Sequence, residues 1–420
     1  MDNQVEFDFR PRLRPDIHFG PPEVKGKKII YYVNDQYTDQ FYRLGEKEHF
    51  VLNEMNGQRT LSDIAKNYDA RFGKQLDQRA WAGLFALLDA RQMLEGRTDP
   101  AMLAELKEKS ERKRRESQSW LTRRFRLVNP NRVLETVLPW VDFMFRPWVL
   151  MAGILLILVT EVWVLLHIRA IGHDAWMIRR DWHIWAVFMG MLFFSALIHE
   201  SAHGLTCKHF GGTVKDMGVM WRYLWFYPYC KLDHIVLFHN RRHRIWVAFA
   251  GTYASMLLMI PFSLLWWFSA TTSLWHVVSA KMLTLFCFVS LLNFIPFLQL
   301  DGYFMLAHAL GMSDLRKESY AFIKKVILGQ SGWDQEYNMK EKRVYAVYGL
   351  LSMLITLCLI GAMVFFWHNI LTVRLGSTRA WIIVLTVLVL SVTGKLTMNW
   401  VKKVVKEWWA SYRDQTPATG

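Results

Sequence analysis

The chain has 420 residues, of which 52% are hydrophobic, and it carries a formal net charge of +15. A single soluble domain is excluded because long apolar runs fill residues 148–400, whereas residues 1–147 are polar and charged. In a soluble protein this charge would indicate nucleic-acid binding, but here the basic residues flank the apolar runs, as the positive-inside rule predicts. We therefore expect a mainly α-helical, polytopic membrane protein with no nucleic-acid partner.

Residues 1–97 are predicted to form a small α+β domain of winged-helix-like type. The segments 27–33 and 40–44 are rich in β-branched and aromatic residues and predict two strands. Three helices are expected over 46–55, 60–73 and 77–94, and the second has Thr60 as N-cap, Asp63 at its third position and Gly73 as its stop. The first twenty residues contain no apolar segment typical of a signal peptide, so we expect this domain in the cytoplasm.

Residues 98–147 are expected to form a basic linker followed by interfacial helices. The run "EKSERKRRESQSWLTRRFR" has two interpretations, which stay open. It is either a solvated helical linker or an anchor on acidic lipid, with Trp120 and Phe125 at the membrane interface.

Apolar length predicts a six-span membrane domain over residues 148–400 and a cytoplasmic tail over 401–420. The loops on the side of the N-terminus hold most of the basic residues, so both termini are expected in the cytoplasm. The four cysteines have no CxxC spacing, and no disulfide framework is expected. The predicted spans are 148–168, 182–206, 244–268, 278–308, 343–368 and 380–400.

The second span ends in the motif "HESAH", which places His199, Glu200 and His203 where apolar residues are the rule. Two histidines four residues apart lie on one face of a helix and can chelate one zinc ion. Glu200 is then placed to take a proton from a water at the metal, which is the logic of HExxH hydrolases. The alternative is a pH-sensing or hydrogen-bonded histidine pair.

A third ligand is expected from "NFIPFLQLDGYFM", late in the fourth span. Asp301 needs a partner inside the membrane, and a cation is the natural one. Pro296 is expected to break or kink this helix. Asn293 either donates a hydrogen bond to a substrate carbonyl or oxyanion, or makes a structural bond between helices. The loop charges place Asp301 at the same membrane depth as the HExxH motif.

The paired motifs resemble those of the site-2 protease family of intramembrane zinc metalloproteases. The resemblance covers about residues 182–310 and includes "HESAH", "FGG", "LDG" and the N-x-x-P pattern of Asn293 and Pro296. It implies that His199, His203 and Asp301 bind Zn²⁺ and that Glu200 is the general base. In "AGTYASM" the residues Thr252 and Ser255 replace the usual Pro and Asn, which weakens a transfer of substrate-binding roles to that segment.

About residues 28–96 resemble PqqD-like peptide-recognition domains of the machinery for ribosomally made, modified peptides. The combination resembles peptide zinc metalloproteases of peptide-export clusters. It implies a bacterial inner-membrane protein that processes a leader-bearing or transmembrane peptide, with the lipid bilayer and an export adaptor protein as further partners. The loop between "FGG" and Arg244 is expected to supply edge strands that pair with an extended substrate, or else an interfacial aromatic belt.

Two rival functions remain open. One is a membrane di-iron oxygenase, because "HNRRH" at 239–243 forms a second histidine box. The other is a catalytically inactive membrane chaperone or export component that binds peptides. The loop histidines His209, His234, His239 and His243 are either polar loop residues or ligands of a second metal.

Overall fold

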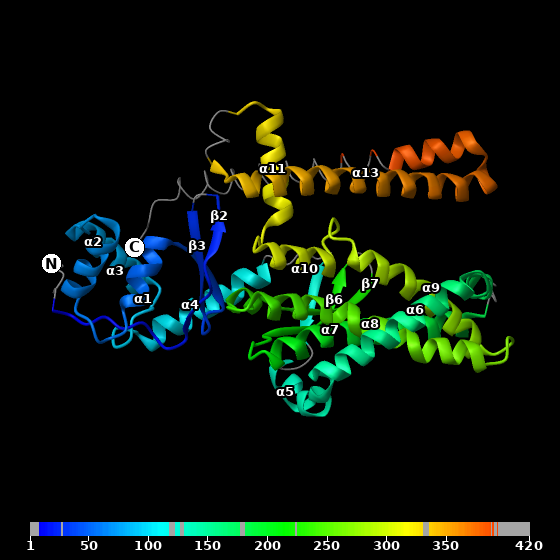
Figure 1. Cartoon of the computed structure of the whole chain (residues 1–420), viewed down its shortest axis with the longest axis horizontal. Helices are drawn as coiled ribbons and strands as arrows, with labels where there is room; N and C mark the ends of the chain where they lie inside the picture. Colours follow the sequence, from blue (N-terminus) through cyan, green and yellow to red (C-terminus); the bar gives the residue numbers. More distant parts are fainter. Residues whose placement is uncertain are drawn as a thin grey trace, which may run out of the picture. The chain divides into compact units, whose positions relative to one another are not determined.

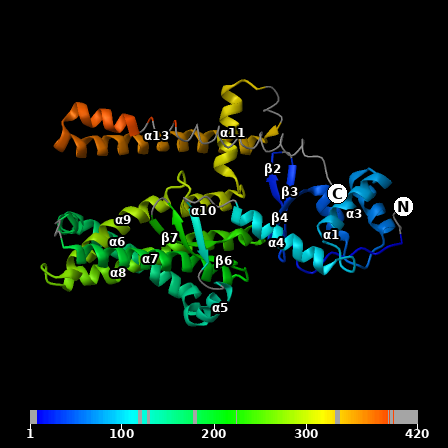
Figure 2. The ribbon, with the colours of Figure 1, turned by 180° about the vertical axis from the view of Figure 1, so that it is seen from behind.

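The computed structural model describes residues 8–26, 28–116, 122–126, 130–176, 181–222, 225–330, 336–387, 389 and 393 (Figure 1). It is mainly helical, with a small β-sheet region near the N-terminus (Figure 2). It divides into two units, Met1–Tyr348 and Gly349–Gly420. The described part of the second unit holds most of helix α13 (Met339–Leu375) and a short apolar helix, Ser377–Val387.

The N-terminal region contains one antiparallel sheet and three helices. β3 lies at the centre of the sheet, with β4 on one side and β1 and β2 on the other. The register pairs Val33 with Tyr42 and with Phe19. The two strands expected from sequence are confirmed as β3 and β4, whereas β1 and β2 were not predicted. The bounds are β1 (Ile17–Phe19), β2 (Glu23–Lys25), β3 (Lys28–Asp35), β4 (Gln40–Gly45), α1 (Glu46–Glu54), α2 (Leu61–Phe72) and α3 (Gln78–Ala90).

The predicted ends of α2 are confirmed. The Thr60 side chain accepts a hydrogen bond from the Asp63 amide, and the Asp63 carboxylate accepts one from the Thr60 amide, so the capping box is complete. Gly73 ends the helix with φ of 63°, a left-handed conformation that glycine adopts without strain. Trp81 and Leu88 of α3 are fully buried against α1 and α2, and they anchor the core of this region.

The linker is partly helical and partly strand. Helix α4 (Pro100–Glu116) agrees with the helical interpretation, but β5 (Thr122–Arg126) pairs with a strand of the later chain. Phe125 is exposed on this strand, and Trp120 lies outside the described residues. The expected interfacial segment consists of α5 (Pro130–Val141) and the short 3-10 helix η1 (Asp142–Phe145).

Five helices among the described residues are long and apolar enough to cross a membrane. Their apolar side chains are largely exposed on α6 and α13, which suits contact with lipid rather than water. They are compatible with an integral membrane protein. The sixth predicted span, 380–400, falls largely outside the described residues. The five are α6 (Pro147–Trp176), α7 (Trp182–His209), α8 (Arg241–Phe268), α9 (Leu274–Phe294) and α13, which is apolar enough over Met339–Val373.

The fourth predicted span is not one continuous helix, which confirms the break expected at Pro296 and corrects the predicted bounds 278–308. α9 ends at Phe294, and a new helix, α10 (Asp301–Leu310), begins after an irregular segment. Pro296 explains the break because proline has no amide hydrogen and holds the preceding residue, Ile295, in an extended conformation. Asp301 is therefore the first residue of a short helix rather than part of a span. Helix α11 (Leu315–Ile327) follows.

The chain between α7 and α8 forms a β-hairpin. β6 (Asp216–Arg222) lies between β5 and β7 (Trp225–Lys231), so β7 is an edge strand of the described sheet. Pro228 is tolerated there because an edge strand does not need every amide for pairing. The 3-10 helix η2 (Asp233–Leu237) then leads to α8. Sequence analysis expected strands in this loop, and the structure confirms them.

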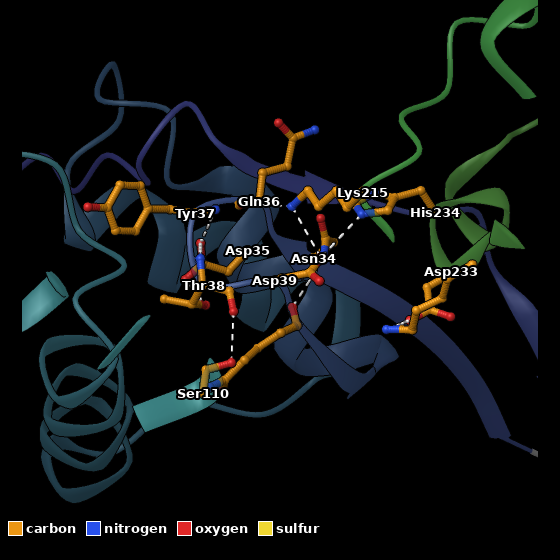
Figure 3. Close-up of polar contacts among 12 residues, drawn as sticks. Asn34, Asp35, Gln36, Tyr37, Thr38, Asp39, Ser110, Lys215, Asp233 and His234 are labelled. Carbon is orange, nitrogen blue, oxygen red and sulfur yellow. Dashed lines mark hydrogen bonds and ion pairs between the residues drawn. The ribbon is translucent and has the colours of Figure 1, made fainter. Parts of the chain in front are cut away.

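The turn between β3 and β4 contacts both ends of this hairpin (Figure 3). The Asp39 carboxylate lies 3.1 Å from the Lys215 ammonium, directly before β6, and 3.3 Å from Nε2 of His234, in η2. The Lys215 ammonium also donates to the carbonyl of Gln36 at 2.6 Å. On the other side of the turn, the Ser110 hydroxyl of α4 donates to the carbonyl of Thr38.

Candidate metal centre

Helix α7 places its two motif histidines on one face, one turn apart. Their Nε2 atoms lie 3.3 Å from each other, and the rings meet edge to face. The His203 side chain is 9% exposed and that of His199 is 18% exposed, so little water reaches either ring.

Asp301 completes the cluster from the start of α10. One of its carboxylate oxygens lies 3.5 Å from Nε2 of His199, and the other lies 3.5 Å from Nε2 of His203. The break at Pro296 makes this possible because it turns the chain and sets a new helix start against α8. Among the described residues, these three form the one group of histidine, cysteine and acidic side chains with metal-ligand spacing.

The second ring nitrogen of each histidine is held by helix α8. The Nδ1 atom of His203 lies 2.6 Å from the carbonyl oxygen of Val247, and that of His199 lies 2.9 Å from the Ser255 hydroxyl. A carbonyl oxygen only accepts, so Nδ1 of His203 carries the proton and its Nε2 has a free lone pair. Both Nε2 atoms point to the shared centre, which is the arrangement that metal-binding histidines adopt.

The distances fit a tetrahedral zinc site. Zinc binds imidazole nitrogen and carboxylate oxygen at about 2.0–2.1 Å, so ligand atoms on a tetrahedron lie about 3.3–3.4 Å apart. The two Nε2 atoms are 3.3 Å apart, and each lies 3.5 Å from a different oxygen of Asp301, so the pairwise contacts are close to this edge length. Two imidazoles and a carboxylate are also a donor set that zinc accepts, with one position left for water or substrate.

A glycine keeps the centre open. A Cβ atom on Gly251 of α8 would lie 2.3 Å from Nε2 of His203 and 2.7 Å from Nε2 of His199. Any side chain there would fill the space that the ligand atoms face. Gly302, directly after Asp301, packs as closely, since its Cβ would lie 2.6 Å from the Asn293 carbonyl oxygen. These two glycines let α8 and α10 approach the histidines and the end of α9.

The Glu200 carboxylate is held by β7. It accepts a hydrogen bond of 2.9 Å from the backbone amide of Cys230. The edge strand β7 and the "HESAH" motif are therefore in direct contact. Burial, and then the nearby Glu200 carboxylate, raise the pKa of the Cys230 thiol.

Asn293 and the loop histidines are not members of the three-residue cluster. Asn293 is buried in the last turn of α9, and no hydrogen bond joins its side chain to the three residues among those described. His209 pairs with Asp142, and His234 pairs with Asp39. His243 stacks on Phe210, and neither it nor His239 joins a second metal-binding group within the described ranges.

Sequence analysis missed the supporting residues on α8. The Thr252 hydroxyl donates to the Asp301 carboxylate at 2.6 Å, and Ser255 holds His199. Both were judged only as departures from a family pattern. Their signal was present, because two small polar residues three positions apart on one face of an apolar span are expected to bond to a neighbouring helix.

The comparisons with known proteins give no relative: no protein-family model, no curated protein and no solved structure matches this chain.

Proposed function

We propose that the chain is an intramembrane zinc metalloendopeptidase of the site-2 protease type. It hydrolyses a peptide bond in a membrane-associated or leader-bearing peptide, as in the processing of a ribosomally made precursor. The observation that carries this proposal is the convergence of His199 and His203, near the end of α7, and Asp301, at the start of α10, whose ligand atoms all lie within 4.8 Å of one another.

His199, His203 and Asp301 would hold the zinc ion. A zinc ion in such a site supplies a water that ionises near neutral pH and a Lewis acid that polarises a carbonyl group. The hydrogen bonds that the three ligands form with Val247, Ser255 and Thr252 fix the orientation of these ligands, so that little reorganisation accompanies the reaction.

Glu200 acts as general base and then as general acid. It follows His199 on α7, and its carboxylate takes a proton from the attacking water and returns it to the leaving amine. The amide of Cys230 supports this role because it positions the carboxylate without neutralising it. Asn293 donates to the substrate carbonyl or the developing oxyanion.

The outer edge of β7 is the proposed docking edge for an extended substrate. The Cys230 amide points away from β6, to the outer edge of β7, where it meets Glu200. Backbone groups two and four residues away on a strand point to the same edge, so those of Pro228 and Phe226 also lie there. Pro228 offers only its carbonyl, whereas Phe226 offers both groups. A peptide that pairs there runs toward Glu200, which brings its backbone to the metal centre.

The N-terminal region is proposed to be a PqqD-like winged-helix domain that binds a leader peptide by strand addition. β4 supports this because one of its edges faces away from β3 in the described sheet. A fused recognition domain raises the effective concentration of substrate at the centre. We place the chain in a bacterial inner membrane with six spans and with both termini on the cytoplasmic side. An export adaptor protein would be a further partner.

The test is co-expression with candidate precursor peptides, read by mass spectrometry. Wild type is expected to give a defined cleavage product, and Glu200→Gln is expected to give none while it keeps its zinc. Glu161→Gln, which makes the same change in α6, serves as the matched control and retains cleavage. Equal cleavage by wild type and Glu200→Gln would refute the mechanism. Peptide binding without cleavage would favour the chaperone function, and two irons per chain would favour the oxygenase.

A further inference from the structure

An apolar groove of about 740 Å³ runs along the α7–α8 helix pair. None of the three residues of the metal centre lines it. Ile198 and Ala202 of α7 form one wall, and Trp246 and Ala254 of α8 form another. The remaining wall comes from α5, η1 and the first turns of α6.

The groove has the length of a lipid chain in one leaflet. It extends on α7 from Leu197 to His209 and on α8 from Arg242 to Ala254. At 1.5 Å per helical residue, each stretch is about 18 Å long. One leaflet of a bilayer core of about 30 Å measures about 15 Å. The groove is therefore long enough to hold an acyl chain of one leaflet.

Polar groups gather at one end of the groove. Nδ1 of His209 lies 2.8 Å from the Asp142 carboxylate, and Nε2 of His243 lies 3.3 Å from the Asn240 amide nitrogen. Arg242 is exposed at this end, and no carboxylate among the described residues forms an ion pair with it. The groove thus combines an apolar channel with one guanidinium group that is available to an anion.

We propose that this groove binds one anionic phospholipid of the bilayer. One acyl chain lies between α6, α7 and α8, and the phosphate pairs with Arg242, whose planar guanidinium suits phosphate oxygens. An extended peptide is a poor occupant because its backbone amides and carbonyls would find almost no partners along the apolar walls. A lipid chain has no such groups.

The proposed lipid contacts the two helices that carry the metal centre. Ile198 and Ala202 precede His199 and His203 directly in sequence, and Ala250 of the groove precedes Gly251. The bound acyl chain occupies the groove along α7 and α8. It is therefore a structural ligand of α7 and α8, whether or not the chain hydrolyses peptides.

Native mass spectrometry of the delipidated full chain tests the proposal. Phosphatidylglycerol, phosphatidylcholine and inorganic phosphate are added separately. Phosphatidylglycerol is expected to form a one-to-one complex at least about ten times tighter than phosphatidylcholine, and inorganic phosphate at equal concentration is expected not to displace it. Arg242→Gln should weaken the complex about tenfold or more. Arg241→Gln, the adjacent and equal loss of charge outside the groove, should leave it unchanged.

A second variant tests the channel itself. Ala254→Phe fills the deep end and should abolish the complex, with its folding checked by size-exclusion chromatography. Should it not fold, the Arg242 and Arg241 pair decides. Equal binding by these two variants, equal affinity for the two lipids, or displacement by phosphate would each overturn the proposal.

Discussion

Gly251→Ala is the sharpest perturbation of the metal centre. Its new methyl group would lie 2.3 Å from Nε2 of His203 and 2.7 Å from Nε2 of His199. Carbon and nitrogen atoms do not approach closer than about 3.0 Å without a shift, so α8 or the rings must move by about 0.7 Å. A zinc ion bonded to both nitrogens at about 2.0–2.1 Å needs the same space.

Gly251→Ala is expected to lower zinc affinity more than the loss of a residue that hydrogen-bonds to a metal ligand. Removing one hydrogen bond to a metal ligand costs 10–100-fold, and Gly251→Ala blocks the position itself, so we expect a loss above about 100-fold. Overpacking should also lower the free energy of unfolding by about 1–3 kcal/mol.

Zinc affinity is measured by competition with a chelator of known affinity. Gly190→Ala is the matched control, because a Cβ at Gly190 of α7 meets no atom within 4 Å. It should bind zinc as wild type does. If Gly251→Ala binds zinc with wild-type affinity, the centre does not lie where the three ligand atoms converge.

Three further predictions follow from the hydrogen bonds. Ser255→Ala should lower zinc affinity about 10–100-fold, measured by the same competition, because Nδ1 of His199 loses its partner. Cys230→Pro should lower the cleavage rate about tenfold at unchanged zinc content, because Glu200 loses an amide donor, whereas Cys230→Ala keeps that donor and its rate. Burial raises the pKa of Asp39, but its imidazole and ammonium partners outweigh burial and lower it from 3.8 to about 2. Its stabilising contribution, about 2 kcal/mol, is therefore complete above about pH 4 and lost as pH falls toward 2. The hydrogen-exchange protection factor of the β3–β4 turn should fall over that range in wild type and be low at all pH values in Asp39→Asn; a turn equally protected in both would contradict this.

The residues of the metal centre were predictable because each breaks a local rule. Histidine and aspartate inside apolar runs require partners, and the loop charges predict that they lie at one depth. Pro296 likewise predicted a break. The sequence did not predict what this break allows, which is that Asp301 starts a new helix. The turn of the chain between Pro296 and Asp301 is set by the packing of Gly302 on α9.

The supporting parts were hidden because tertiary contacts determine them. β5 reads as a charged linker, and only its pairing with β6 makes it a strand. The Cys230 amide has no side-chain signature, so no sequence pattern reveals its bond to Glu200. The groove on α7 and α8 is likewise formed by residues of both helices whose alignment depends on how the two helices pack.

X-ray absorption at the zinc edge of the purified chain tests the central claim most directly. The account predicts about one zinc per chain, with nitrogen and oxygen neighbours at about 2.0–2.1 Å, two of them imidazoles, and a spectrum lost in Asp301→Ala. A sulfur neighbour at about 2.3 Å, which would implicate Cys207 or Cys230, or a spectrum unchanged in Asp301→Ala, would contradict it.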